Sequence, residues 1–209
     1  MSRSVSFAGV ILAAGESSRM GTDKALLPWP PSAKASNSTE TFLSAAIRTL
    51  SDSTDFVVIV AGKNESALAP VVYAQGASLA VNPDPGQGQF SSLRVGLQEV
   101  LNRGRDAAIV TLVDRPAANT NTVRQLREEF EAAPQSVWAV VPQVSGKHGH
   151  PFIAGRELIE AFLRAPVTAT AREIEHQYQE HIRYVAVDDP FVAVNINTPE
   201  DYSALTEKT

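Results

Sequence analysis

The chain has 209 residues and a formal net charge of −5, and its 44% hydrophobic and 20% charged content is ordinary for a globular protein. The negative balance argues against a general nucleic-acid binder, which would carry a basic face to neutralise phosphates. No apolar run approaches the roughly 20 residues that a membrane span needs, and the absence of cysteine excludes disulfides, thiolate metal sites and cysteine nucleophiles. We expect a single domain over residues 1–209, located in the cytoplasm, that binds neither nucleic acid nor membrane.

Short apolar runs alternate with amphipathic segments along the chain. We expect strands at residues 10–12, 56–60, 77–81, 106–113, 137–141, 182–187 and 191–196, helices at 39–50, from Ser91 or Ser92 onward, at 119–133 and at 168–178, a strand and a helix within 146–163, and a last helix from Pro199. Nearly continuous apolar strands that alternate with helices favour parallel pairing, buried on both faces. The pattern therefore predicts an α/β protein with a mostly parallel central sheet.

The stretch over residues 10–27, VILAAGESSRMGTDKALL, has the composition of an anion-binding loop. The apolar strand breaks into Ala13, Ala14 and Gly15, whose small side chains let a polyphosphate approach the backbone N–H groups. Arg19 adds a planar fork of donors and Lys24 a compact charge. Neither GxxxxGK[ST] nor GxGxxG is present, so this is not one of the two commonest phosphate loops.

The spacing of this loop, LAAGxSxRMGxxKxLLP, resembles the signature of the MobA-like nucleotidyltransferases, and of their molybdenum cofactor cytidylyltransferase branch in particular. The resemblance implies a three-layer, Rossmann-like nucleotidyltransferase fold. It also implies that Arg19 and Lys24 are catalytic. The nucleotide-binding residues expected in this first part of the chain are Leu12, Ala13, Ala14, Gly15, Arg19, Lys24 and Gly62.

A second segment, NPDPGQGQFSSLRVGL over residues 82–97, resembles the family's asparagine-containing turn followed by a serine-rich helix start. By that resemblance Asn82, Ser91 and Ser92 contact the nucleotide. The alternative is that the two serines only cap the helix.

Two further motifs concern the metal. Asp114 follows the expected strand 106–113, and an acid at the carboxyl end of a strand is well placed for chemistry. Magnesium prefers such hard oxygen ligands, and the family has a metal-binding aspartate here in a G-D-x-P motif, although Val113 replaces the glycine. In VNINTPEDY, residues 194–202, Asn195 and Asn197 stand where many relatives have acids, and we expect Asn195 to be a weaker second contact with Mg²⁺.

The segment 146–163, GKHGHPFIAGRELIEAFL, carries a G-H-P that similar proteins also show. We expect His150 to contact the acceptor or a backbone carbonyl, because no second cluster at zinc spacing accompanies it. Arg172, near the start of the helix expected at 168–178, would meet an acceptor phosphate or lie on the surface. The Pro-rich loop 28–37 either covers part of the cleft or is a plain surface loop.

The residues and the resemblance together predict a magnesium-dependent nucleotidyltransferase that moves a nucleoside monophosphate to a phosphorylated acceptor and releases pyrophosphate. The resemblance implies CTP, with GTP as the second candidate, molybdopterin as the acceptor, and a molybdoenzyme as the recipient of the finished cofactor. The alternatives are a guanylyl or sugar-phosphate nucleotidyltransferase and a non-catalytic nucleotide- or cofactor-binding protein.

Overall fold

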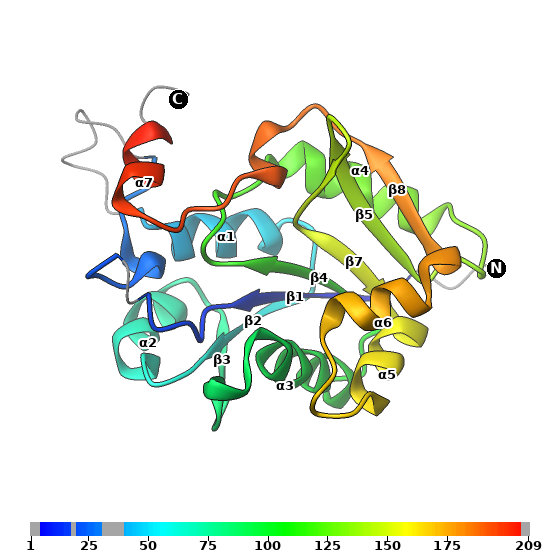
Figure 1. Ribbon diagram of the computed structural model, residues 1–209, viewed down its shortest axis with the longest axis horizontal. Helices are drawn as coiled ribbons and strands as arrows, with labels where there is room; N and C mark the ends of the chain where they lie inside the picture. The colour runs from blue at the N-terminus through cyan, green and yellow to red at the C-terminus, as the bar shows by residue number, and fades with distance from the viewer. Residues whose placement is uncertain (1–4, 18–19, 31–39, 206–209) are drawn as a thin grey trace.

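The computed structural model describes residues 5–17, 20–30 and 40–205 (Figure 1). Arg19 lies outside these ranges, as do residues 31–37 of the Pro-rich loop and the first residue expected in helix 39–50. The predictions for those residues stay predictions.

The described chain builds one eight-stranded sheet in the order β3-β2-β1-β4-β7-β5-β6, with β8 paired to β5. The strands are β1 (Phe7–Leu12), β2 (Phe56–Ala61), β3 (Ser78–Val81), β4 (Ala107–Leu112), β5 (Ala139–Val144), β6 (Lys147–His148), β7 (Phe152–Gly155) and β8 (Ile182–Ala186). The neighbours β3, β2, β1 and β4 run parallel, as do β5 and β8, whereas β7 is antiparallel to both β4 and β5. The predicted mostly parallel sheet is confirmed.

Helices cover both faces of the sheet and make the fold three-layered (Figure 1). One face carries α1 (Phe42–Ser51), α2 (Glu65–Ala74) and α4 (Thr120–Glu131), and the other carries α3 (Gln89–Asn102), α5 (Arg156–Arg164) and α6 (Ala171–Gln177). The last helix, α7 (Pro199–Leu205), packs beside α1 through a small cluster that includes Phe42 and Ile196.

Alternation along β1 divides its side chains between the two core layers. Phe7 and Ile11 pack in the layer with α1 and α4, while Val10 and Leu12 pack in the layer with α3 and α5. All six residues of β1 are buried, as expected for a parallel strand between two helical layers. Helix α3 approaches so closely that a Cβ at Gly96 would lie 2.5 Å from Val10 Cγ1, so only glycine fits there.

The structure corrects three details of the predicted elements. Residues 191–196 are not a strand: Pro190–Ala193 forms a 3₁₀ turn, because the Asp189 carboxylate accepts a hydrogen bond from Phe191 N and Pro190 fixes the first turn. Helix α3 begins at Gln89, before Ser91. The strand expected at 137–141 is shifted to Ala139–Val144.

Candidate active site

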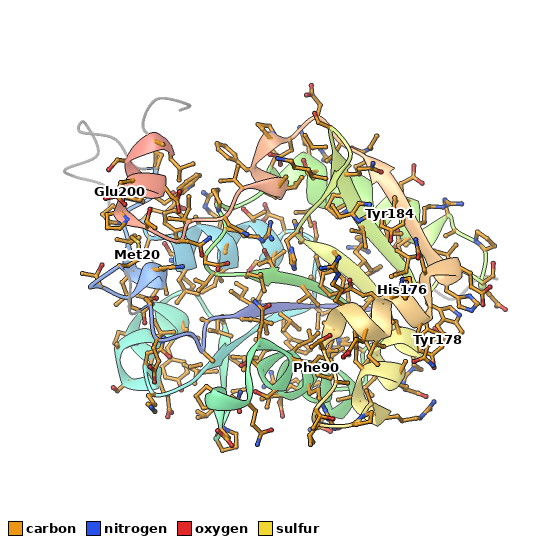
Figure 2. The ribbon with its side chains drawn as sticks, viewed as in Figure 1. Met20, Phe90, His176, Tyr178, Tyr184 and Glu200 are labelled. Atoms are coloured by element: carbon orange, nitrogen blue, oxygen red, sulfur yellow. The ribbon has the colours of Figure 1, made fainter. Side chains whose placement is uncertain are left out.

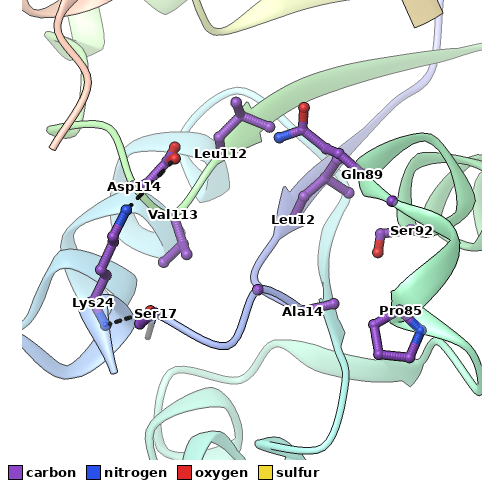
Figure 3. Close-up of a pocket in the computed structure, with 12 residues that line it drawn as sticks. Leu12, Ala14, Ser17, Lys24, Pro85, Gln89, Ser92, Leu112, Val113 and Asp114 are labelled. Atoms are coloured by element: carbon purple, nitrogen blue, oxygen red, sulfur yellow. Dashed lines mark hydrogen bonds and ion pairs between the residues drawn. The ribbon is translucent and has the colours of Figure 1, made fainter. Parts of the chain in front are cut away.

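The loop after β1 opens a cavity of about 180 Å³ at the carboxyl edge of the parallel strands (Figure 3). Its wall contains Leu12 at the end of β1, Leu112 and Asp114 at the end of β4, and the start of α3. In open α/β sheets ligands bind outside the carboxyl ends of the strands, so the position agrees with the sequence-based expectation. The lining is Leu12, Ala14, Gly15, Ser17, Lys24, Pro85, Gly88, Gln89, Ser92, Leu112, Val113 and Asp114.

Lys24 reaches this cavity from a short 3₁₀ helix, Lys24–Leu26, that Asp23 caps by accepting a hydrogen bond from Ala25 N. The residue is only 9% exposed. Its Nζ lies 4.0 Å from Asp114 Oδ2 and 3.5 Å from Asn197 Oδ1. Among the described residues that line the cavity, Lys24 alone carries a positive charge, so it is the group that would neutralise bound phosphates.

Asn197 is brought to Lys24 by the C-terminal segment. Asp201 Oδ2 accepts hydrogen bonds from the backbone N–H groups of Asn197 (2.8 Å) and Thr198 (2.9 Å), and these bonds hold the pKa of Asp201 below its ordinary value. The Ile196 N–H donates to the Asp114 carbonyl at 2.8 Å, which ties the segment to the end of β4. Thr198 caps α7, because its Oγ1 accepts a hydrogen bond from Asp201 N.

Asn64 fixes the loop after β1 to the end of β2. Its Nδ2 donates to Ala13 O (2.9 Å) and Asp23 Oδ2 (2.6 Å), and its Oδ1 accepts from Gly62 N (3.0 Å). A Cβ at Gly62 would lie 2.9 Å from Ala14 O, so glycine lets the loop pass close by. Ala13 and Gly62 therefore shape the cavity from behind.

Asn82 organises the turn before α3. Its buried Nδ2 donates to Ser91 Oγ (2.8 Å) and Ser92 Oγ (2.9 Å), and its Oδ1 accepts from Asp84 N (3.0 Å). Asn82 thus positions the two serines, and only Ser92 of the three lines the cavity. Neither serine hydroxyl bonds to an N–H group of the first turn of α3, and Ser91 Oγ instead donates to Gly88 O.

Asp114 has the chemistry that a divalent cation requires. Its Oδ1 is buried without a hydrogen-bond partner, while Oδ2 faces Lys24. Within the described ranges no cluster of three or more His, Cys, Asp or Glu exists that could hold a metal by itself. A single carboxylate together with substrate phosphates is a usual magnesium environment, so the residues present fit a metal that arrives with the nucleotide. The Asn195 side chain is exposed and forms no hydrogen bond with the described residues.

A second cavity, of about 690 Å³, adjoins the first and shares Leu12, Gly88, Gln89 and Leu112 with it. Both predicted acceptor-binding residues, His150 and Arg172, line this second cavity. Burial and the neighbouring Arg115 lower the pKa of His150 to about 3, so the ring is neutral near pH 7. Its Nδ1 is buried and has no hydrogen-bond partner among the described residues.

The predicted residues thus form two groups. Leu12, Ala14, Gly15, Lys24, Ser92 and Asp114 line the first cavity, and Ala13, Gly62, Asn82 and Ser91 support it. Arg94 of α3 does not line the first cavity, and its guanidinium donates to the Leu163 and Ala165 carbonyls at the end of α5. Sequence reasoning missed Asn64, Gln89 and Glu175. For Asn64 the signal was an asparagine two residues after the glycine that ends a strand.

A Gly-containing loop, a lysine and a carboxylate at the carboxyl edge of a parallel sheet define a nucleotide-binding α/β protein. Residues 9–183 match the family model described as the MobA-like NTP transferase domain. The chain therefore belongs to the MobA-like NTP transferase family, and it is a nucleotidyltransferase.

Relatives and solved structures agree with this family. The chain is 26% identical over 200 residues to a probable molybdenum cofactor guanylyltransferase of Rhodopirellula baltica, covering 92% of this chain and 88% of the relative. It is 23% identical over 201 residues to the molybdenum cofactor cytidylyltransferase of Escherichia coli, covering 95% of each. The crystal structure of Rv0371c from Mycobacterium tuberculosis H37Rv superposes with a TM-score of 0.80 at 26% identity, over 98% of this chain and 100% of that one. A manganese complex of Rv0371C has a TM-score of 0.76 at 25% identity, over 98% and 100%.

No helix within the described ranges is long and apolar enough to cross a membrane. The cytoplasmic location expected from the sequence stays a prediction.

Proposed function

We propose that this protein transfers cytidylyl from CTP to the phosphate of molybdopterin, with magnesium, and releases pyrophosphate. A phosphate oxygen of the acceptor attacks the α-phosphorus of the nucleotide, a new P–O bond forms, and the bond from that phosphorus to the oxygen leading to the β-phosphorus breaks. The single observation that carries the proposal is the placement of Lys24 and Asp114 together at the carboxyl edge, beside a larger cavity that would take the acceptor.

The chain's own residues would mainly position and neutralise the reactants. Lys24, and Arg19 by resemblance to the family, would neutralise the phosphates of the leaving group. The backbone of Ala14 and Gly15 would lie against the nucleotide, and Ser92 would offer a hydroxyl to it. His150 and Arg172 would contact the acceptor from the second cavity. No side chain has to act as a nucleophile, because in-line transfer needs orientation more than covalent help.

Magnesium would be held by Asp114, with an amide oxygen of the C-terminal segment as a further contact. When bound it would neutralise charge on the transferred phosphoryl group. Asn195 was the sequence-based choice for that amide, whereas the structure brings Asn197 Oδ1 to Lys24. We therefore propose Asn197, in addition to Asn195, as a candidate magnesium contact.

CTP is favoured over GTP by two sequence features, LAAG at residues 12–15 and FSSLRVGL at residues 90–97. The relatives carry both activities in their names, at 26% and 23% identity. GTP is therefore the second candidate. A molybdoenzyme would receive the product.

Pyrophosphate release tests the proposal. The assay would offer CTP, GTP, ATP and UTP, each with magnesium and with molybdopterin or a simple sugar phosphate. Turnover that needs molybdopterin and prefers CTP would support the proposal. Turnover with a sugar phosphate alone would assign another acceptor, and no turnover with any pair would favour a protein that binds the nucleotide or cofactor without reaction.

A further inference from the structure

Glu175 is an acid inside the second cavity whose role no sequence motif explains. It lies on α6 three residues after Arg172, on the same side of the helix, and both side chains line the cavity. It is half-buried, and it forms no hydrogen bond or ion pair with the described residues. Burial raises the pKa of Glu175 above its ordinary value, and the charge of Arg172 opposes this rise only in part. A carboxyl group that loses hydration on burial and gains no hydrogen-bond donor in return is unfavourable, until a ligand supplies such a donor.

Part of the lining of the second cavity is aromatic. Phe90 comes from α3, Phe152 from β7 and His148 from β6. The His148 ring is stacked on Tyr184 of β8, with ring centroids 4.0 Å apart and planes 14° from parallel. In the view of Figure 2, α6 lies between Phe90 and Tyr184. Such walls suit a planar heterocycle, and about 690 Å³ is ample for one with substituents.

The polar groups of the cavity have separate tasks. His150 stays neutral, so its ring can donate or accept a hydrogen bond, while Arg172 can form an ion pair with an anionic group. Glu175 is the acid among the residues described as lining the cavity. A carboxylate has two acceptor oxygens in one plane, which match two adjacent N–H donors on the edge of a ring.

Resting on the proposed function, we propose that Glu175 determines acceptor specificity by accepting hydrogen bonds from the amidine-like N–H edge of a planar heterocycle in the acceptor. A pterin ring presents that edge through its ring N–H and its 2-amino group. Guanine presents the same edge, so the nucleotide base is the other source of this chemistry. The second cavity adjoins the nucleotide cavity through Gln89 and Leu112, which lets a ring beside Glu175 carry its phosphate to the reaction centre.

The test compares ligands that differ at that edge only. Binding of pterin and of lumazine, which replaces the 2-amino group by a carbonyl, would be measured by calorimetry for the wild type, Glu175→Gln and Glu175→Asp. Glu128→Gln, an exposed acid of α4 on the opposite face of the sheet, is the matched control. A second arm measures GMP against IMP, which lacks the 2-amino group of guanine. Thermal unfolding of each variant verifies that the fold is kept.

We expect the wild type and Glu128→Gln to bind pterin at least about tenfold more tightly than lumazine, because a site built for a donor rejects an analogue that lacks it. Glu175→Gln should bring this ratio close to one, and Glu175→Asp should weaken pterin while keeping the preference. The ratio of GMP to IMP should be the same in all four proteins.

Three results would overturn the proposal: an unchanged pterin preference in Glu175→Gln, no pterin binding by the wild type, or an effect of Glu175→Gln on the GMP to IMP ratio, which would move Glu175 to the nucleotide base. Because binding needs no turnover, the assay is independent of pyrophosphate release. Failure of the proposed transfer and failure of this assignment are therefore distinguishable.

Discussion

The Nζ atom of Lys24 lies 3.5 Å from Oδ1 of Asn197, although 173 residues separate the two in the chain. The same Nζ lies 4.0 Å from the Asp114 carboxylate. The loop after β1, the end of β4 and the C-terminal segment thus meet at one ammonium group. Its charge is balanced in part before any phosphate arrives.

Lys24→Ala should abolish most turnover and leave the fold intact. Losing one preorganised charged contact in the transition state costs about 3 kcal/mol, which is roughly a hundredfold in kcat. Lys147→Ala is the control, because Lys147 is an exposed lysine of β6 that lines neither of the two cavities. The measurement is the rate of pyrophosphate release by the two variants. Full activity of a folded Lys24→Ala protein would remove Lys24 from the reaction.

The magnesium requirement should separate Asp114 from the two asparagines. Asp114→Asn should raise the half-saturating magnesium concentration about tenfold or more, because it removes the only full negative charge described in the lining of the first cavity. Asn197→Ala should raise the half-saturating magnesium concentration less. Asn195→Ala should raise it least, because Asn195 is exposed. Magnesium titrations of turnover give the order. A larger effect at Asn195 than at Asp114 would place the metal elsewhere.

His150 should make stability depend on pH below its ordinary titration range. The folded pKa is about 3 against an ordinary value of 6.5, so the unfolded state takes up a proton that the folded state does not. This contribution is fully present above pH 6.5 and is lost as the pH falls toward 3, by up to about 1.4 kcal/mol per pH unit. The free energy of unfolding, measured with denaturant between pH 4 and 8, should depend less steeply on pH for His150→Asn than for the wild type. Equal slopes would mean that His150 titrates normally.

Asp189 should be a major source of stability near the site. Its Oδ2 accepts from Asn119 N (2.7 Å) and Thr122 Oγ1 (2.9 Å), and its Oδ1 accepts from Phe191 N (3.1 Å), all around a carboxylate that is 1% exposed. Asp189→Ala should lower the free energy of unfolding by about 3 kcal/mol, because buried donors lose a charged acceptor. Asp189→Asn keeps one oxygen and should lose less. Urea unfolding checks the order, and equal losses would show that the oxygen kept in Asp189→Asn preserves none of these hydrogen bonds.

The sequence predicted the layers of the fold and pointed to Lys24 in the loop after β1 and Asp114 after β4, because these follow from local patterns. It favoured Asn195 as the second metal contact, which stays a prediction, although Asn195 and Asn197 are only two residues apart and equivalent by periodicity. The position of Asn197 beside Lys24 depends on long-range packing, in which Asn197 N donates to Asp201 Oδ2 and Ile196 N donates to the Asp114 carbonyl. Likewise the apolar run after Pro190 has the composition of a strand, but the Asp189 carboxylate accepts a hydrogen bond from Phe191 N and so caps a 3₁₀ segment.

Side-chain partners could not be read from the sequence either. The contact of Asn82 with the nucleotide stays a prediction, whereas the structure shows that its amide N–H groups donate to Ser91 and Ser92. Arg94 is a cation near the cleft in sequence, but the carbonyls at the end of α5 bind its guanidinium. Glu175 lies in an ordinary helical segment and becomes notable only because the fold puts it in a cavity.

Thermal unfolding with nucleotides tests the central claim most directly. A ligand that prefers the folded state raises its stability by about 2.7 kcal/mol at a hundred times its Kd. With magnesium at equal nucleotide concentration, CTP should raise the melting temperature more than GTP, ATP or UTP, and Lys24→Ala should remove most of that rise. A larger shift with GTP would assign the guanylyl reaction, and no shift with any nucleotide would contradict a nucleotide site at Lys24 and Asp114.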